Sequence, residues 1–520
     1  MKRRAIIHIG TGKTGSTTLQ TILAVNREAM QAQGFAYPTS PGRRNHMRLA
    51  VYAANGRRAD EFARMIGEGG DAPTASRRFA AELGQELESL PDSIHTVIFS
   101  NEHLANKADT PEATQRLKAL LDNYFDSYRI VVYLRRQDEY AVSLYTTRLR
   151  AGDTHQDILG PMTAPRSLAR LNWADLLDRW AAAFGRSSLA PRIFARDAFV
   201  EGDLVADFRA VCGLGSLPLT GEDAVQNPSL QPAAQEFIRR LNLSARGVEE
   251  EPAETEFDDD DPDSERGTGR VPLLVRSVLD TRFPGPGRRP SRAEAEAFVN
   301  LFAESNERIR AEFFPQRAQI FSADFSRYPE TADPLPSDAE VLEVAIAVIR
   351  DQQVKADAQA AEALYRRALN KQLEGSPAEA WRFLRRALGK MPGHLGALRA
   401  LIENADTPER RQEANLRLRQ ARDAEPERKE LSALARRLSR GRHPEPGDMR
   451  DAPGREGERE LDRPAASRTE ESLGPRGAEA GAEPTGKKER PRLTAEERAS
   501  RRARREQREE QRAARRATAA

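Results

Sequence analysis

The stretch Ala5-Ile-Ile-His-Ile-Gly-Thr-Gly-Lys-Thr-Gly-Ser-Thr-Thr-Leu-Gln20 decides the fold of the chain. Its first part, residues 5–9, is a short apolar run rich in β-branched side chains, which predicts a buried strand. Glycines at positions 10, 12 and 15 interrupt that run, and a helical pattern follows toward Met30. A strand, a glycine-rich turn and a helix with hydroxyls in its first turn are typical of a phosphate-binding loop, because helix N–H groups and the helix dipole attract anions.

Two kinds of phosphate-binding loop fit parts of this stretch. The NTPase motif G-x-x-x-x-G-K-[ST] ends as Gly12-Lys13-Thr14 does, but its first glycine would fall on Ile7. The core Lys13-Thr14-Gly15-Ser16-Thr17 resembles instead the 5′-phosphosulfate loop of the PAPS-dependent sulfotransferases, Lys-(Ser/Thr)-Gly-(Thr/Ser)-Thr. An ordinary strand-to-helix turn is the plain alternative, since a glycine-rich loop alone is a weak signal.

A second motif follows the apolar run 130–134, which predicts another buried strand. Arg135 stands at the end of that strand, and Ser143 lies two helical turns further on. A guanidinium and a hydroxyl so placed can converge on one phosphate. Sulfotransferases show the same Arg and Ser spacing and bind the 3′-phosphate of PAPS with it, so the resemblance implies that role for Arg135 and Ser143. The plain alternative is two solvated residues.

The resemblance covers residues 1–330 and implies a P-loop-type parallel sheet flanked by helices, an α/β fold. It implies that PAPS is the co-substrate and PAP the product, with the 5′-phosphosulfate held by Lys13, Thr14, Gly15, Ser16 and Thr17. It further implies that Lys13 stabilises charge on the bridging oxygen. A sulfuryl group carries less charge than a phosphoryl group, so no metal is expected.

Sulfuryl transfer also needs a base that removes the acceptor proton. Residues 96–100 predict a third buried strand, and Glu102 follows it at the ligand-binding end of a parallel sheet. Glu102 is therefore the expected base, with His103 and His46 as the other candidates. The plain alternatives are an acid near a helix start for Glu102 and a surface or capping role for His46.

Further elements are expected between these motifs. Residues 34–38 and 189–194 predict strands, and residues 197–214 predict a helix that includes Cys212 as a core residue. The basic loop at 284–290 occupies the place where sulfotransferases close over the 3′-phosphate, but it lacks their Arg-Lys-Gly pattern, which leaves the role of Arg288 and Arg289 open. The acidic run 254–263 predicts a solvated insertion, with a metal site as the alternative.

Composition sets limits on partners and location. The chain has 520 residues, of which 38% are hydrophobic and 31% charged, so a folded part plus a polar part is expected. A net charge of +2 gives no reason to expect a nucleic-acid partner. The single cysteine excludes an intramolecular disulfide, and the short apolar run near the start is neither a signal peptide nor a membrane span. We expect a cytoplasmic protein.

The chain changes character beyond residue 330. Residues 338–440 read as helices, and Ala380, Leu384 and Ala387 recur 34 residues later, at the period of tetratricopeptide repeats. Two repeats are few, and a plain helical hairpin is the alternative. Either form suits a protein partner rather than catalysis. Residues 441–520 are rich in Arg, Glu, Pro and Gly without aromatic side chains, which predicts a disordered, charged tail.

The expected function is therefore transfer of a sulfuryl group from PAPS to a hydroxyl or amine. The resemblance to bacterial carbohydrate-modifying members favours a saccharide or glycan acceptor. Two alternatives stay open. One is a P-loop kinase or NTPase, which lacks the first glycine of its motif; the other is a scaffold in which the helical region is the working part.

Overall fold

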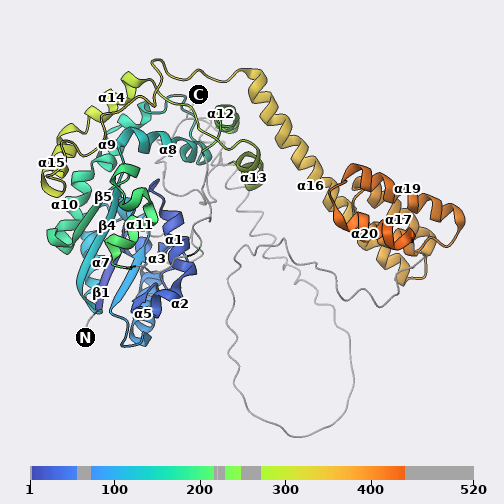
Figure 1. Cartoon of the computed structure of the whole chain (residues 1–520), viewed down its shortest axis with the longest axis horizontal. Coiled ribbons are helices and arrows are strands. Elements are labelled where there is room, and N and C mark those ends of the chain that lie inside the picture. Colours follow the sequence, from blue (N-terminus) through green and yellow to red (C-terminus); the bar gives the residue numbers. More distant parts are fainter. Residues whose placement is uncertain (1–2, 55–71, 216–219, 221–228, 247–270, 440–520) are drawn as a thin grey trace, which may run out of the picture. The chain divides into compact units, whose positions relative to one another are not determined.

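The computed structural model describes residues 3–54, 72–215, 220, 229–246 and 271–439. At its centre lies a five-stranded parallel sheet with the strand order β2-β3-β1-β4-β5 (Figure 1). The strands are β1 Arg3–His8, β2 Phe35–Ala36, β3 Thr96–Ser100, β4 Phe125–Leu134 and β5 Leu189–Ile193. This sheet and its flanking helices confirm the predicted α/β fold.

The strand order places a topological switch point at β1 and β3. These two strands are neighbours, and His8 of β1 is in register with Ser100 of β3. The chain leaves β1 toward β2 on one side and leaves β3 toward β4 on the other. Loops that depart in opposite directions open a crevice at the carboxyl ends of the strands, where open α/β sheets bind ligands. The predicted phosphate loop and Glu102 both follow strands at this point.

Helices cover both faces of the sheet, and alternate side chains of the strands belong to the core on one face or the other. Ile7 and Phe99 belong to a core with residues from α3 Met47–Ala53, α5 Ala72–Ser89, α7 Pro111–Leu121 and α10 Trp173–Phe184. Ile6 and Ile98 belong to the opposite core with α1 Ser16–Val25 and α11 Leu204–Cys212. Successive strand residues point to opposite faces, so continuous apolar strands are what two helical layers require.

The remaining helices of this part connect the strands or cover the sheet margins. They are α2 Arg27–Gln31, α6 Leu104–Lys107, α8 Gln137–Arg150, α9 Pro165–Leu171, α12 Pro232–Arg246, α13 Leu273–Arg282, α14 Arg292–Asn300 and α15 Ala303–Phe313. The helix predicted over 197–214 is wrong in its first half, which forms two short 3₁₀ turns. Glu201 has a φ of 56° there, and Asp203 then caps α11 by accepting from the N–H of Ala206 at 2.8 Å.

Between residues 338 and 439, the described part of the chain forms helices and no strand. They are α16 Asp338–Leu373, α17 Pro377–Lys390, α18 Leu395–Glu403, α19 Pro408–Ala424 and α20 Lys429–Ser439. The recurring residues Ala380, Leu384 and Ala387 are buried, and so are their counterparts Ala414, Leu418 and Ala421. Their burial agrees with an all-helical region packed through small side chains, while the tetratricopeptide assignment and the domain boundaries stay predictions.

Several expectations fall on other parts of the chain. The acidic run 254–263 and the tail 441–520 lie outside the described residues. Among the helices that the structure describes, none is long and apolar enough to cross a membrane.

Candidate functional site

The loop between β1 and α1 is held by backbone bonds to β4. The N–H of Thr11 donates to the carbonyl of Tyr133 at 3.2 Å, and the N–H of Tyr133 donates to the carbonyl of Gly10 at 2.7 Å. Inside the loop, the buried Thr14 hydroxyl donates to the carbonyl of Thr11 at 2.6 Å. Thr14 therefore shapes the loop with its side chain, and only its backbone is left to face a ligand.

The start of α1 has the features of an anion site. Gly15 is its N-cap residue with a φ of 76°, a left-handed conformation that favours glycine. No side chain caps this helix, and its first turn contains no acidic residue. Uncapped N–H groups at the positive end of a ten-residue helix suit a phosphate or sulfate. Ser16 and Thr17 add hydroxyls to this turn.

Lys13 joins the loop to α8. Its backbone is also left-handed, with a φ of 61°, which a residue with a side chain rarely adopts. The Lys13 ammonium donates to the Thr147 hydroxyl of α8. From the other side, Nη1 of Arg135 donates to the carbonyl of Lys13 at 2.8 Å. Lys13 is thus fixed at both its backbone and its side chain.

Arg135 precedes α8, and three polar residues of α8 follow it at regular spacing; the four are called here the α8 stripe. Glu139, Ser143 and Thr147 lie four residues apart, which puts them on one side of the helix, and Arg135 stands four residues before Glu139. Arg135 and Thr147, the two ends of the stripe, both contact Lys13. Ser143 lies between them and is half-buried. Lys13 is therefore in contact with the predicted ligand residue Arg135, and Ser143 lies on the helix between Arg135 and Thr147.

Glu102 lies against the same loop. A Cβ atom added to Gly10 would meet the Cα of Glu102 at 3.0 Å and its Cβ at 3.2 Å, and the φ of 102° at Gly10 also favours glycine. The half-buried Glu102 carboxylate accepts from Nε2 of Gln20 at 2.6 Å. Nδ2 of Asn45 lies 3.4 Å from both of its oxygens. Two amides therefore orient a carboxylate directly beside the phosphate loop.

His46 has a different environment from Glu102. It is fully buried, its Nε2 donates to the carbonyl of Pro38 at 2.9 Å, and its Nδ1 accepts from the N–H of Ser100 at 3.3 Å. Burial lowers the pKa of His46 to about 3. Both ring nitrogens of the neutral His46 are hydrogen-bonded to the backbone, so the ring links β3 to the start of α3. His46 therefore takes no part in the chemical step proposed below. His103 is also buried.

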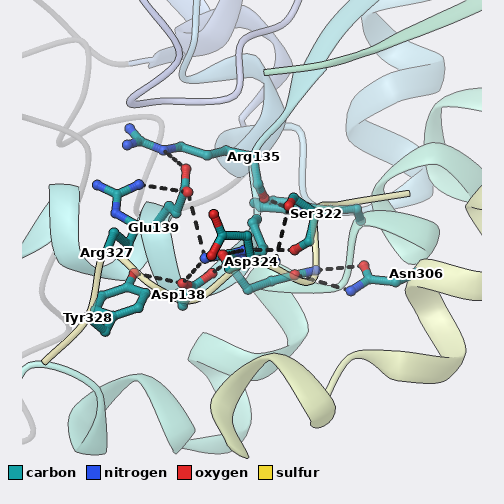
Figure 2. A network of polar contacts seen from close by, with 11 residues as sticks. Arg135, Asp138, Glu139, Asn306, Ser322, Asp324, Arg327 and Tyr328 are labelled. Carbon is teal, nitrogen blue, oxygen red and sulfur yellow. Dashed lines mark hydrogen bonds and ion pairs between the residues drawn. The ribbon is translucent and has the colours of Figure 1, made fainter. Parts of the chain in front are cut away.

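A polar network closes the other side of Arg135 (Figure 2). The segment after α15 crosses the start of α8, and Arg136 binds it by donating to the carbonyls of Ser322 at 2.7 Å and Asp324 at 2.9 Å. Arg136 also pairs with the buried Asp138 through two bonds of 2.8 and 2.9 Å. The Tyr328 hydroxyl donates to the same carboxylate at 2.6 Å. This network fixes the crossing segment to α8.

The crossing segment brings another cation to the stripe. Nη1 of Arg327 donates to Oε1 of Glu139 at 2.7 Å, while Nε of Arg135 lies 3.5 Å from Oε2 of the same carboxylate (Figure 2). Burial lowers the pKa of Arg135, and Glu139 opposes that shift. Nη2 of Arg136 lies 3.8 Å from Oε1 of the same carboxylate. Glu139 is therefore one anion shared by three guanidinium groups, a geometry that a phosphate oxygen would also satisfy.

Arg288 and Arg289 support the crossing segment from the loop at 284–290. Nη2 and Nε of Arg288 donate to the carbonyl of Asp333, and Arg289 forms an ion pair of 3.0 Å with the Asp333 carboxylate. Nη1 of Arg289 also donates to the carbonyl of Arg327 at 3.0 Å. Arg288 and Arg289 therefore contact the same crossing segment that carries Arg327.

Three functional candidates were missed by the sequence: Gln20, Asn45 and Arg327. Each makes its contact with a site residue that is distant along the chain, and no motif in the sequence points to that contact. Within the described ranges, no group of three or more His, Cys, Asp or Glu side chains is placed to hold a metal ion.

Comparisons with known proteins give few neighbours. No protein-family model matches the chain. It is similar to an uncharacterized protein of Archaeoglobus fulgidus, with 27% identity over 226 residues that cover 42% of this chain and 54% of the relative. The match thus spans about half of that relative. The crystal structure of a sulfotransferase from Alicyclobacillus acidocaldarius aligns with a TM-score of 0.30 and 16% identity, over 44% of this chain and 88% of that one. At that TM-score the likeness carries no argument, so function is argued from the site.

Proposed function

We propose that the chain is a PAPS-dependent sulfotransferase that moves a sulfuryl group to a hydroxyl or amine of an acceptor and releases PAP. One observation carries the proposal: at the carboxyl ends of β1, β3 and β4, the loop after β1 contacts both Arg135 and Glu102. Lys13 is fixed between Arg135 and α8, and Gly10 of the same loop touches Glu102. An anion site and a carboxylate base side by side are what sulfuryl transfer requires.

Each group has a role in this proposal. The 5′-phosphosulfate is expected at the start of α1, against Lys13, Gly15, Ser16 and Thr17. The 3′-phosphate is expected on the α8 stripe, held by Arg135 and Ser143, with Arg327 as an additional cation. The Glu139 carboxylate contacts the guanidinium groups of both Arg135 and Arg327, which are groups that a phosphate would also bind. PAPS, as the co-substrate, supplies the sulfuryl group.

Glu102 is the proposed base. Its two amide neighbours hold the carboxylate, and Gln20 donates to one oxygen at 2.6 Å. The acceptor proton would pass to Glu102 as the acceptor oxygen or nitrogen forms its bond to sulfur and the bond from sulfur to PAP breaks. Lys13 would stabilise the negative charge that grows on the departing oxygen.

A saccharide or glycan is the proposed acceptor class. Carboxamides and carboxylates suit hydroxyl groups, because they offer donors and acceptors in one plane. Gln20, Asn45 and Asn101 supply carboxamides around Glu102, and Nδ2 of Asn101 donates to Oδ1 of Asn45.

Calorimetric titration of the full-length chain with PAP, AMP and ATP tests the donor site. PAP and AMP differ by the 3′-phosphate alone, so the proposal expects PAP to bind at least about tenfold more tightly without added metal, as one charge-assisted contact provides. Lys13→Ala should weaken PAP binding. Lys118→Ala is the matched control, because Lys118 forms a surface ion pair with Asp122 on α7.

Transfer of labelled sulfate from PAPS to a panel of saccharides, phenols and amines tests the reaction. Labelled saccharide in the wild type and none in Lys13→Ala would support the whole proposal. Preference for ATP with magnesium over PAP would move the chain to the kinase alternative. Absence of any nucleotide binding would favour the scaffold alternative, in which the helical region 338–440 binds a protein partner.

A further inference from the structure

The first half of α16 has two apolar faces. One face is buried against α12 and α13 and consists of Val341, Val344 and Val348. The second face, called here the α16 stripe, consists of Leu342, Ile346 and Ile349, whose exposed fractions are 58%, 38% and 66%. The buried face fixes this part of the helix to the core, so the stripe is presented on a rigid support.

The stripe has the spacing of a helix-pairing seam. Its residues follow each other after four and then three positions, as the a and d positions of a heptad do. At 3.6 residues per turn, they fall within an arc of about 60° that lies about 130° from the buried valines. Exposed aliphatic side chains in this pattern are typical of a helix that pairs with another helix.

Charged residues border the stripe on one side. Glu343 and Arg350 are both exposed and lie seven positions apart, which are equivalent heptad positions. Neither forms an ion pair with another residue in the part of the chain that the structure describes. Further along the same helix, by contrast, Lys355 pairs with Asp351 and Arg366 pairs with Glu362, each at 2.7 Å. The border of the stripe therefore carries one charge of each sign without an internal partner.

We propose that the α16 stripe is the contact surface of a homodimer in which two copies of α16 pair antiparallel about a two-fold axis. Antiparallel pairing brings the same border of both helices to one side of the interface. With the stripes in contact, Glu343 of one copy comes within about 3 Å, measured along the helix axis, of Arg350 of the other. Two-fold symmetry then gives two equal ion pairs.

Parallel pairing does not use these charges. In a parallel heptad pair, Glu343 lies across the seam from the position of Asp338, which carries the same charge. The pattern therefore selects a second copy in antiparallel orientation over a parallel one. The seam from Leu342 to Gln353 is about 17 Å long, so we expect a weak dimer with a Kd on the order of micromolar.

Sedimentation velocity of the full-length chain over about 1 to 100 µM measures this association directly. The wild type is expected to change from monomer to dimer across the series. Ile349→Asp should raise the Kd at least about 30-fold, because it places a charge at the most exposed apolar position of the seam. Val354→Asp is the matched control: Val354 is 67% exposed on the same helix but lies off the stripe, and this variant should dimerise as the wild type does.

A charge exchange tests the orientation. Glu343→Arg and Arg350→Glu should each raise the Kd about tenfold, and the double variant should return it to within about threefold of the wild type. Circular dichroism checks that each variant is folded. Failure of the double variant to recover overturns the antiparallel pairing.

The remaining outcomes overturn the dimer itself. A wild type that stays monomeric at every concentration excludes the second copy. If Ile349→Asp then lowers the thermal midpoint more than Val354→Asp does, another segment of the same chain covers the stripe. A dimer that Ile349→Asp leaves intact uses a different surface.

Discussion

Arg135 and Arg136 are neighbours in sequence and opposites in environment. Arg136 makes four hydrogen bonds of 2.7 to 2.9 Å, two to Asp138 and two to carbonyls of the crossing segment. In the described part of the chain, the Arg135 guanidinium makes one hydrogen bond, to the carbonyl of Lys13, and an ion pair of 3.5 Å with Glu139. The contrast separates a guanidinium that the fold uses up from one with donors left for a ligand.

The polar residues of the whole site fall into the same two groups: those at the edge of the sheet and those bonded within the fold. Lys13, Glu102 and Arg135 lie at the carboxyl edge of the sheet, in or beside the loop between β1 and α1. Just behind them, Asp138, Tyr328 and His46 bond to other parts of the chain. Substitutions at the edge should change ligand binding and turnover, whereas substitutions behind it should change stability. The predictions below follow that division, from the largest expected effect to the smallest.

Glu102→Gln should lower turnover about 10³-fold, because a general base contributes on that order. PAP affinity should stay within about twofold, since the amide keeps the shape of the side chain and its neighbours Gln20 and Asn45. Steady-state assays with PAPS and PAP titration measure the two quantities. Undiminished turnover would show that Glu102 is not the base and does not belong with the functional residues at the sheet edge.

Arg136→Ala should lower the free energy of unfolding by about 3 kcal/mol, because the buried Asp138 loses its cation. Urea denaturation followed by circular dichroism measures this change. The matched variant is Arg135→Ala, which should cost less than about 1 kcal/mol. Equal losses for the two arginines would break the comparison between them.

Arg135→Ala should instead raise the Kd for PAP about 30-fold, the effect of one charge-assisted contact with the 3′-phosphate. AMP affinity should hardly change, because AMP lacks that phosphate. Titration calorimetry with both nucleotides provides the measurement. A parallel loss of AMP affinity would place Arg135 on the 5′ side of the nucleotide.

The buried histidines make stability depend on pH. Burial lowers the pKa of His46 to about 3 and that of His8 to about 4, below the ordinary value of 6.5. The unfolded chain therefore binds more protons below pH 6.5, and stability that is complete above this pH is lost as the pH falls toward those values. Each ring should contribute a slope of about 1.4 kcal/mol per pH unit. Urea denaturation between pH 7 and 5 should show a smaller slope for His46→Asn; an unchanged slope would mean that His46 is charged in the fold.

Glu139→Gln should tighten PAP binding about threefold, the smallest effect predicted here. Without its charge, residue 139 no longer competes with phosphate for Arg135 and Arg327. Calorimetry at low and high salt measures the change, which should shrink as salt increases. Weaker binding would show that Glu139 positions the arginines rather than competing for them.

Local sequence patterns were enough to predict the strands of the parallel sheet. Apolar runs placed β1, β3 and the second half of β4, because strands buried on both faces are continuously hydrophobic, and shorter apolar patterns placed β2 and β5. The run at 130–134 missed the first half of β4, where Asp126 and Ser127 are exposed and break the pattern. The single helix over 197–214 failed because the sequence pattern gave no sign of the left-handed backbone at Glu201.

The site was predictable only where one segment carries its own signal. Lys13, Arg135 and Ser143 belong to local motifs, and Glu102 ends a strand. Gln20 and Arg327 belong to no motif in the sequence. Their place in the site follows from contacts with Glu102 and Glu139, which are 82 and 188 positions away along the chain. Such pairings follow from strand order and from the path of the crossing segment, which periodicity does not encode.

The contact between Gly10 and Glu102 has a consequence for how this scaffold could change its acceptor. Backbone atoms that follow two adjacent strands set the spacing between this loop and the Cα of Glu102. A substitution elsewhere in the site leaves that backbone spacing unchanged. Under the proposed function, new acceptor preferences should therefore arise from Asn45 and its neighbours just before α3, while the backbone spacing between residues 10 and 102 stays constant.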